Sequence, residues 1–291
     1  DPDAPKGGRL RLGVVGSFDS LNVFSFKGEK AEGIRGFVFE SLLARSGDEP
    51  FSLYGLIAES IDMPDDRSSV TFTLRSIAQF SDGTPLTADD VIFSHALLRD
   101  RGTQNQRGFY AKVERTEKLG PHQVRFVFKP DAAGVYDREL PLIIGLMAIL
   151  PKHKTDLANF ENTSLETPVG SGPYMVAKVD QGRSIVYRRN PAWWARDLPV
   201  GRGRYNFDDI QYEYFKDAAS HFEAFKSGEL DLMGDSDPVR WTTGYNFPAL
   251  ADGRIVKREF ESRLPAGMNA LAFNTRRPVF SDPRVREALI H

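Results

Sequence analysis

Side chains that could bind a metal are present in this chain of 291 residues, but their spacing gives little support for a metal site. Asp235 and Asp237 could hold a divalent cation, although such a pair is more typical of a solvated turn. The histidines form no i, i+4 pair and have no carboxylate at ligand spacing; they stand at positions 95, 122, 153, 221 and 291. The absence of cysteine excludes thiolate ligands and thiol catalysis. We expect no metal and no other cofactor.

Nucleophilic and nucleotide-binding motifs are incomplete. Ser171 would need a glycine two residues to either side to form a nucleophile elbow, but Val169 and Pro173 occupy those positions. The stretch 201–206 has the first two glycines of a dinucleotide fingerprint, with Asn206 in place of the third. Paired carboxylates for glycoside hydrolysis would leave no local signature, so an extracellular hydrolase stays open as an alternative. Nothing in the pattern supports an enzyme, and we expect none.

Aromatic residues are the strongest candidates for contact with a ligand. Eight of them fall in or beside expected loops, where burial in the core is less automatic than on strands. Trp and Tyr offer a large, stiff contact area with a polar group at one end. For any one residue, packing against the protein's own sheet is the commoner outcome, but the set favours a binding function. The eight are Phe24, Phe26, Phe109, Tyr110, Trp193, Trp194, Trp241 and Tyr245.

Composition narrows the class of partner. The formal net charge of −2 provides no basic surface of the kind that nucleic acid requires, so we expect no nucleic-acid partner. No window approaches the roughly 20 apolar residues that span a bilayer, and the longest apolar patch, Leu140–Pro151, indicates a buried strand or helix. The opening DPDAPKGG lacks the pattern of a signal peptide, which fits either a cytosolic start or a processed chain.

The elements that must position these residues are strands and helices without regular βαβ order, which predicts mixed sheets in an α/β fold. Alternating apolar residues predict strands over 9–15, 70–75, 122–130 and 207–215, and a hairpin around Gln181-Gly182. Helices are expected over Ile34–Arg45, from a Thr87 cap to about Leu98, and over 218–227 with Gly228 as its end. A strand is expected near residue 270, followed by the start of a helix at the end of the sequence.

The tract Gly170-Ser171-Gly172-Pro173 contains almost no side chain and leads directly into a strand. Glycine is required either where a turn needs positive φ or where backbone must approach another group closely. If the group is a ligand, Gly172→Ala would weaken binding more than it lowers stability. If the tract is only a turn, the same change would lower stability whether or not ligand is present.

Several segments together resemble the family 5 extracellular solute-binding proteins, the peptide and nickel receptors of ABC importers. The segments are DSLNVFS, FVFESLLA, VTFTLRSIAQFSDGTPLTADDVIFS, GSGPYMV, RNPAWW, AFKSGELDLM and FNTRRPVFSDPRVREAL. The likeness is greatest to the YejA-type oligopeptide-binding branch, through DPDAPKGGRLRLG, DEPFSLYGLIAESIDMPDDR and PAGMNALAFNTRRP. Receptors of this family are about twice as long, so the chain resembles their N-terminal half and is expected to stop before the second lobe.

The resemblance implies a fold like that of type II periplasmic binding proteins. A discontinuous first domain would comprise residues 1–45 and 168–265, with a second domain inserted at 46–167. Residues 266–291 would cross into the second lobe. The first-strand loop and the glycine tract would face the ligand cleft, and the inserted domain would add an aromatic contact. The expected ligand-binding residues are Phe24, Lys27, Gly28, Glu29, Phe109, Tyr110, Gly170, Ser171, Gly172, Tyr174, Trp241 and Tyr245.

The resemblance also implies a function. The chain would be the substrate-binding component of an ABC importer and would capture oligopeptides, for which the YejA-type likeness suggests a cell-wall origin. It would act as a periplasmic monomer after removal of a signal peptide. Bare backbone at the glycine tract could pair with an extended peptide as an extra strand would. The peptide would then pass to a permease in the inner membrane. Among binding functions, the alternative is a receptor for a nickel complex or an opine-like ligand.

Overall fold

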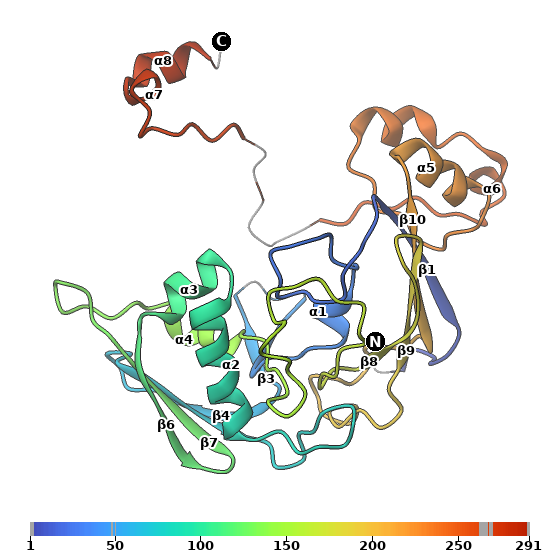
Figure 1. The fold of residues 1–291 in the computed structure, drawn as a ribbon. Coiled ribbons are helices and arrows are strands. Elements are labelled where there is room, and N and C mark those ends of the chain that lie inside the picture. Colours follow the sequence, from blue (N-terminus) through green and yellow to red (C-terminus); the bar gives the residue numbers. More distant parts are fainter. Residues whose placement is uncertain (1–2, 48, 50, 262–266, 268–269, 290–291) are drawn as a thin grey trace.

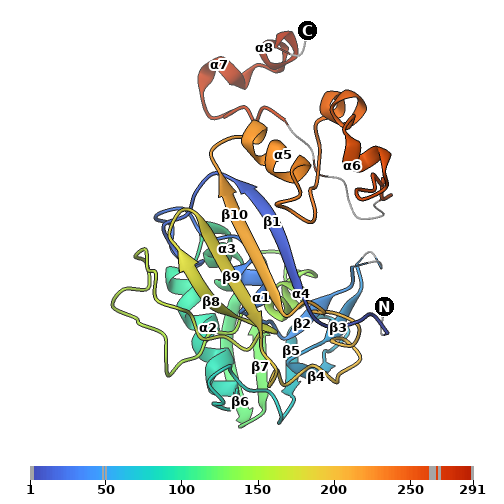
Figure 2. The same ribbon diagram turned by 90° about the vertical axis from the view of Figure 1, so that its right-hand side faces the viewer.

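A computed structural model describes residues 3–47, 49, 51–261, 267 and 270–289. Its first sheet has the strand order β1-β10-β9-β8, in which β1 (Arg9–Val15) runs parallel to β10 (Asp209–Phe215). The hairpin of β8 (Tyr174–Asp180) and β9 (Ser184–Arg189) completes the sheet through antiparallel pairing with β10. The sheet stands upright in Figure 2, with α5 above its upper edge. It is a mixed sheet, as the sequence predicts.

A second, fully antiparallel sheet has the order β4-β5-β7-β6. Its strands are β4 (Ala58–Asp62), β5 (Ser69–Leu74), β7 (Gln123–Phe128) and β6 (Val113–Gly120). Helix α2 (Ala88–Arg101) packs on β6 and β7 (Figure 1), and the buried residues between helix and sheet belong to the largest apolar core of the described chain.

The remaining elements are short. They are α1 (Ile34–Phe37), β2 (Leu43–Arg45), β3 (Leu53–Gly55), α3 (Gln104–Tyr110), α4 (Leu140–Gly145), α5 (Ala218–Lys226), the π-helical turn η1 (Arg240–Gly244), α6 (Pro248–Ala251), α7 (Pro278–Ser281) and α8 (Pro283–Ala288). The apolar patch at Leu140 is therefore partly a buried helix. No helix in the described part of the chain is long and apolar enough to cross a membrane.

The predicted helix over Ile34–Arg45 is wrong beyond its first turn. Helix α1 ends at Phe37, and β2 pairs with β3 instead. The carbonyls of Val38, Glu40 and Leu42 accept hydrogen bonds from Gly172, Ile149 and Ala58, at 2.9, 2.9 and 3.0 Å. Contacts with three distant segments thus replace the local i→i−4 bonds that a longer helix would need.

The predicted hairpin turn forms, whereas the strand predicted near residue 270 does not form over the described residues there. The hairpin turn at Gln181-Gly182 is confirmed, since Gly182 has φ +72° between β8 and β9. The strand expected near residue 270 does not form over 270–274, and Met268 and Asn269 lie outside the described residues.

The predicted division into domains stays a prediction. All strands of the first sheet fall within 1–45 and 168–265, and all strands of the second fall within 46–167. The small β2–β3 sheet crosses the expected boundary at residue 45. Figure 1 shows the two larger sheets side by side, with α1 and β3 between them.

The start of α2 depends more on Asp90 than on the predicted cap, Thr87. The Asp90 carboxylate accepts from Thr87 N at 3.0 Å, from Thr87 Oγ1 at 3.1 Å and from Lys152 N at 3.1 Å. The Asp90 residue is buried. It therefore ties the helix start to the chain that follows α4, in addition to forming a capping box.

We predict that Asp90→Ala lowers the free energy of unfolding by about 2 kcal/mol, because two partly buried backbone N–H groups lose their acceptor. Thr87→Ala should cost about 1 kcal/mol, since Asp90 still accepts from residue 87 N. Urea unfolding of both variants measures the difference. A loss for Thr87→Ala equal to or above that for Asp90→Ala would contradict this ranking.

Candidate functional site

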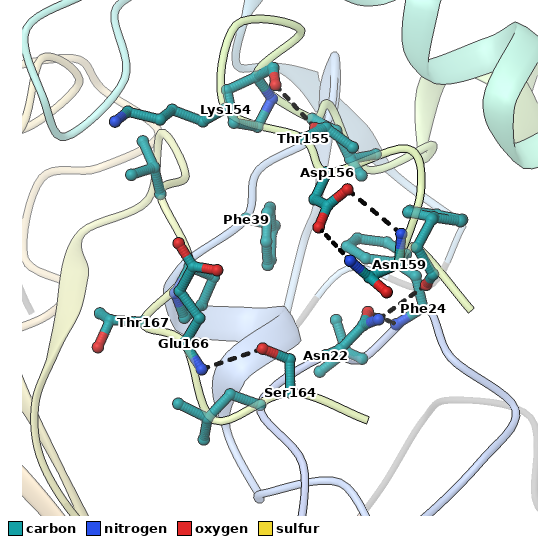
Figure 3. Close-up of a pocket in the computed structure, with 17 residues that line it drawn as sticks. Asn22, Phe24, Phe39, Lys154, Thr155, Asp156, Asn159, Ser164, Glu166 and Thr167 are labelled. Atoms are coloured by element: carbon teal, nitrogen blue, oxygen red, sulfur yellow. Dashed lines mark hydrogen bonds between the residues drawn. The ribbon is translucent and has the colours of Figure 1, made fainter. Parts of the chain in front are cut away.

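A cavity of about 270 Å³ lies between the loop after β1 and the segment 150–169. Three phenylalanines, Phe24, Phe39 and Phe160, contribute apolar wall, and Asn22, Asp156, Asn159 and Glu166 are among its polar lining residues. The Phe39 ring stands in the middle of the labelled side chains in Figure 3. The site therefore combines an aromatic surface with carboxylate and amide groups, a pattern common in small-molecule sites.

The three phenylalanines form one aromatic group. The Phe24 ring meets Phe39 edge-on at a centroid distance of 5.1 Å and stacks with Phe160 at 6.0 Å. Phe24 is only 7% exposed, whereas Phe39 is partly buried. Phe24 was expected to line the cleft, and it does so mainly as support for Phe39. The sequence analysis missed Phe39 and Phe160, because Phe39 was assigned to a helix.

Asn22 ties the loop after β1 to the opposite wall of the cavity. Its Nδ2 donates to the carbonyls of Phe160 and Asn162 at 2.8 and 2.9 Å, and its Oδ1 accepts from Phe24 N at 3.0 Å. The backbone N–H of Leu21 donates to Ser164 O at 2.6 Å. An asparagine in a loop often accepts a hydrogen bond from the backbone two residues on, so the bond to Phe24 N could be expected, whereas the long-range partners of Asn22 could not.

The other residues predicted on this loop lie beside the cavity rather than in its lining. The Lys27 Nζ donates to Asn162 Oδ1 at 3.1 Å. Gly28 adopts φ +72°, and the backbone N–H of Glu29 donates to Asp19 Oδ1 at 2.8 Å. Gly28 is thus a turn residue. The Lys27 and Glu29 residues are exposed, and their contact with a ligand stays a prediction.

The glycine tract approaches the protein's own backbone. A Cβ on Gly170 would lie 2.0 Å from Val38 O, and one on Gly172 would lie 2.2 Å from Phe37 O, both far shorter than van der Waals contact. Gly172 N donates to Val38 O at 2.9 Å. Neither glycine has positive φ, so a turn does not explain them. Gly170, Ser171 and Gly172 are all buried where the chain packs on residues 37–38, and their contact with a ligand stays a prediction.

Glu40 is a buried carboxyl group held by two neighbouring indoles. It accepts from Trp193 Nε1 at 2.9 Å and from Trp194 Nε1 at 3.0 Å, and Trp194 Nε1 also lies 3.1 Å from Ser171 O. Burial raises the pKa of Glu40 to about 8, although the hydrogen bonds from its neighbours oppose the shift. Both tryptophans thus have structural partners. The group joins α1, the glycine tract and the turn after β9.

Tyr174 is also a core residue. Its ring is 1% exposed, and its hydroxyl donates to Phe207 O at 2.8 Å. The side chain of Tyr174 thus has internal partners, and its contact with a ligand stays a prediction.

The aromatic pair predicted on the inserted domain lies away from the cavity lining. Tyr110 is 4% exposed and packs against His95 at a centroid distance of 5.7 Å. Its burial raises the pKa of its hydroxyl to about 12. Phe109 is partly buried, and Lys112 Nζ lies 5.1 Å from its ring centroid. Neither residue lines the Phe39 cavity, and the ligand contacts of Tyr110 and Phe109 stay predictions.

Trp241 and Tyr245 line a different, larger cavity of about 870 Å³. Lys257 Nζ lies 4.3 and 5.4 Å from their ring centroids. The Tyr245 hydroxyl donates to Asp235 at 2.9 Å, and Arg240 binds the same carboxylate with two N–H groups at 2.6 and 2.7 Å. Asp235 is therefore a buried ion-pair partner rather than part of a solvated turn. Within the described residues, no three His, Asp or Glu side chains cluster as metal ligands would.

A family model described as bacterial extracellular solute-binding proteins, family 5 Middle, matches residues 52–291. The chain belongs to this family. Its members bind solutes and are not enzymes, which confirms the predicted absence of catalysis. Peptidoglycan-binding protein YepA of Agrobacterium fabrum is 44% identical, over 99% of this chain and 49% of that protein. Protein YejA of Escherichia coli K12 is 37% identical, over 99% of this chain and 47% of that protein. The predicted likeness to the YejA branch is confirmed, and the chain spans about half the length of these relatives.

Solved structures of family 5 proteins share the fold. The binding protein MoaA of Agrobacterium tumefaciens R10, in complex with mannopinic acid, superposes with a TM-score of 0.74 and 27% identity, over 99% of this chain and 55% of that one. The oligopeptide-binding protein AppA of Bacillus subtilis, in complex with a nonapeptide, superposes with a TM-score of 0.63 and 25% identity, over 78% of this chain and 44% of that one. The fold is thus that of periplasmic binding proteins, as predicted.

The raised pKa of Glu40 predicts that stability falls with rising pH. The unfolded carboxyl loses its proton near pH 4.5, but the folded one keeps it to about pH 8. The stabilisation is therefore complete below pH 4.5 and is lost between pH 4.5 and 8, by up to about 1.4 kcal/mol per pH unit. The free energy of unfolding, measured with urea at several pH values in this range, should fall less steeply with pH in Glu40→Gln than in the wild type. The exposed control Glu139→Gln should keep the wild-type slope; parallel slopes in all three proteins would contradict the assignment.

Gly172→Ala should lower the apo melting temperature clearly and cost about 2 kcal/mol or more, since the new Cβ meets backbone that cannot rotate away. Gly108→Ala is the matched control. A Cβ there meets nothing within 4 Å in helix α3, so this change should be neutral or stabilising. Calorimetry without ligand measures both. An unchanged melting temperature for Gly172→Ala, together with weaker ligand binding, would restore the ligand interpretation.

Proposed function

We propose that this protein is the substrate-binding component of an ABC importer, that it captures oligopeptides derived from the cell wall in the periplasm, and that it delivers them to a permease of the inner membrane. The Phe39 cavity is the proposed site for part of the peptide. The observation that carries the proposal is that the aromatic group of Phe39, Phe24 and Phe160 lines the same cavity as the carboxylate residues Asp156 and Glu166.

The chemistry of the cavity suits a peptide. An apolar side chain of the ligand would pack on Phe39, and a ligand amino group would meet Asp156 or Glu166, whose carboxylates flank the Phe39 ring in Figure 3. The exposed Lys27 and Glu29 would add contacts at the rim. The volume of about 270 Å³ is near the lower limit of ligand sites, about 300–1,000 Å³, so the cavity would hold an anchoring portion of the peptide.

The relatives support a peptide from the cell wall. YepA, at 44% identity, is named a peptidoglycan-binding protein, and AppA was solved with a nonapeptide. A second candidate is an opine-like ligand, because MoaA covers 99% of this chain and was solved with mannopinic acid. Both candidates would use an enclosed site of two lobes, and both agree with a non-enzymatic binding role.

Ligand identity can be tested by mass spectrometry of the full chain after purification, followed by calorimetry with a cell-wall tripeptide and with mannopinic acid. We expect the tripeptide to bind and mannopinic acid not to bind. The reverse result would favour the opine-like candidate, and binding of neither would contradict the proposal.

Phe39→Ala should weaken tripeptide binding at least tenfold, about 1.4 kcal/mol, because the ligand loses its aromatic wall. Phe109→Ala is the control, since Phe109 is also partly buried but lies outside the cavity lining. Circular dichroism checks that both variants are folded. Equal losses in the two variants would contradict the assignment of the cavity and favour a contact at Phe109.

A further inference from the structure

A second kind of site lies between the β2–β3 hairpin and the loop 199–204. A cavity of about 560 Å³ opens there, and four arginines line it: Arg45, Arg75, Arg202 and Arg204. Arg45 lies on β2 and Arg75 directly follows β5, whereas Arg202 and Arg204 lie more than a hundred residues later. The fold thus brings positive charges from three separate segments to one concave surface. This cavity shares no lining residue with the Phe39 cavity.

These four arginines form no ion pair with the acidic residues that the structure describes. Among the residues that the structure describes, none of the four takes part in an ion pair, although many other arginines of the chain do. Tyr54, which also lines the cavity, donates to Glu49, but Glu49 forms no ion pair with these arginines. Lys6 adds a positive charge nearby, since its Nζ donates to Arg204 O at 3.1 Å. In a chain of net charge −2, this is a local excess of positive charge.

Two of the guanidinium groups are held in place by contacts that leave N–H groups unused. Arg75 donates through Nε to Leu56 O at 3.0 Å, and no other hydrogen bond of its guanidinium is present among the described residues. The Arg204 guanidinium lies 5.1 Å from the ring centroid of Tyr205. Such contacts orient the planar group and leave its terminal donors for an anion.

The backbone beside Arg204 is in an unusual conformation. Tyr205 has φ +56°, which residues other than glycine rarely adopt. Its ring packs edge-on against Trp193 at a centroid distance of 5.1 Å, so tertiary contacts hold the strained residue. Gly201, in the same loop, packs so closely on Ala195 O that a Cβ would not fit. Strained residues held by their surroundings are found preferentially at functional sites.

We propose that this cavity binds a multivalent oxyanion of the phosphate class, independently of the solute in the Phe39 cavity. Guanidinium groups present paired N–H donors that match two oxygens of a phosphate group. Four of them around one cavity match a ligand with more than one negative charge. The alternative is that the arginines are solvated and bind no ligand. That alternative gives no reason for four unpaired cations to share one concave surface, where they repel each other.

The test is calorimetric titration of the full chain with inorganic pyrophosphate at constant ionic strength. The double variant Arg202→Gln/Arg204→Gln should lose at least tenfold in affinity. Arg196→Gln is the matched control, because Arg196 is an exposed arginine near the same loop that pairs with Asp197 at 3.1 Å and does not line the cavity. The control should bind as the wild type does. Absence of binding at millimolar pyrophosphate, or equal affinity in the double variant, would overturn the proposal.

The phosphate group could belong to a free molecule or to a lipid headgroup. Flotation with cardiolipin vesicles, whose headgroup carries two phosphate groups, and with phosphatidylcholine vesicles as the control, separates these sources. Pyrophosphate binding together with flotation on cardiolipin but not on phosphatidylcholine, both lost in the double variant, would assign a headgroup. Pyrophosphate binding without flotation would assign a free phosphate compound. The tripeptide titration of the Phe39 cavity is read separately, so failure of either proposal leaves the other standing.

Discussion

The fold depends on a buried junction at which residues 37–40 meet the glycine tract and the two tryptophans after β9. The Glu40 carboxyl group satisfies both indole N–H groups, and the Gly172 N–H satisfies the Val38 carbonyl. No room is left for a Cβ at Gly172, and no cationic side chain among the described residues pairs with Glu40. Ionisation of a buried carboxyl group without a neighbouring cation costs free energy. The Glu40 carboxyl group therefore stays buried by retaining its proton and by accepting hydrogen bonds from the indoles.

This junction determines where the candidate solute site lies. Phe39 sits between Val38 and Glu40, so the backbone bonds at 38 and 40 fix the position of its ring on the cavity wall. The opposite wall, 150–169, ends where the glycine tract begins. Asn22 then binds the loop after β1 to that wall through two carbonyl groups. The site is therefore built from segments that are rigid for structural reasons, which is a requirement for selective binding.

Charge is distributed unevenly over the described chain. Asp235 and Arg240 form a compact buried pair beside one cavity, and the aromatic rings of Trp241 and Tyr245 cover a lysine there. The arginines at the β2–β3 hairpin have no such partners. Neutralised charges contribute to local structure, whereas uncompensated charges on a concave surface create a potential that attracts anions. The two cavities thus differ in chemistry although both combine cations with aromatic rings.

The sequence by itself determined the local elements, because alternating apolar residues, capping residues and turn glycines act over a few positions. The elements that could be predicted are β1, β5, β7, the β8–β9 hairpin and the start of α2. Its motifs also determined the family. Only the tertiary structure decided the partner of Glu40, which lies 153 residues from Trp193, and the reason for the glycines at 170 and 172. It likewise decided that residues 38–45 leave the helix. These outcomes depend on which distant backbone groups compete for the same hydrogen bonds and space, and a local pattern of residue types carries no information on that competition.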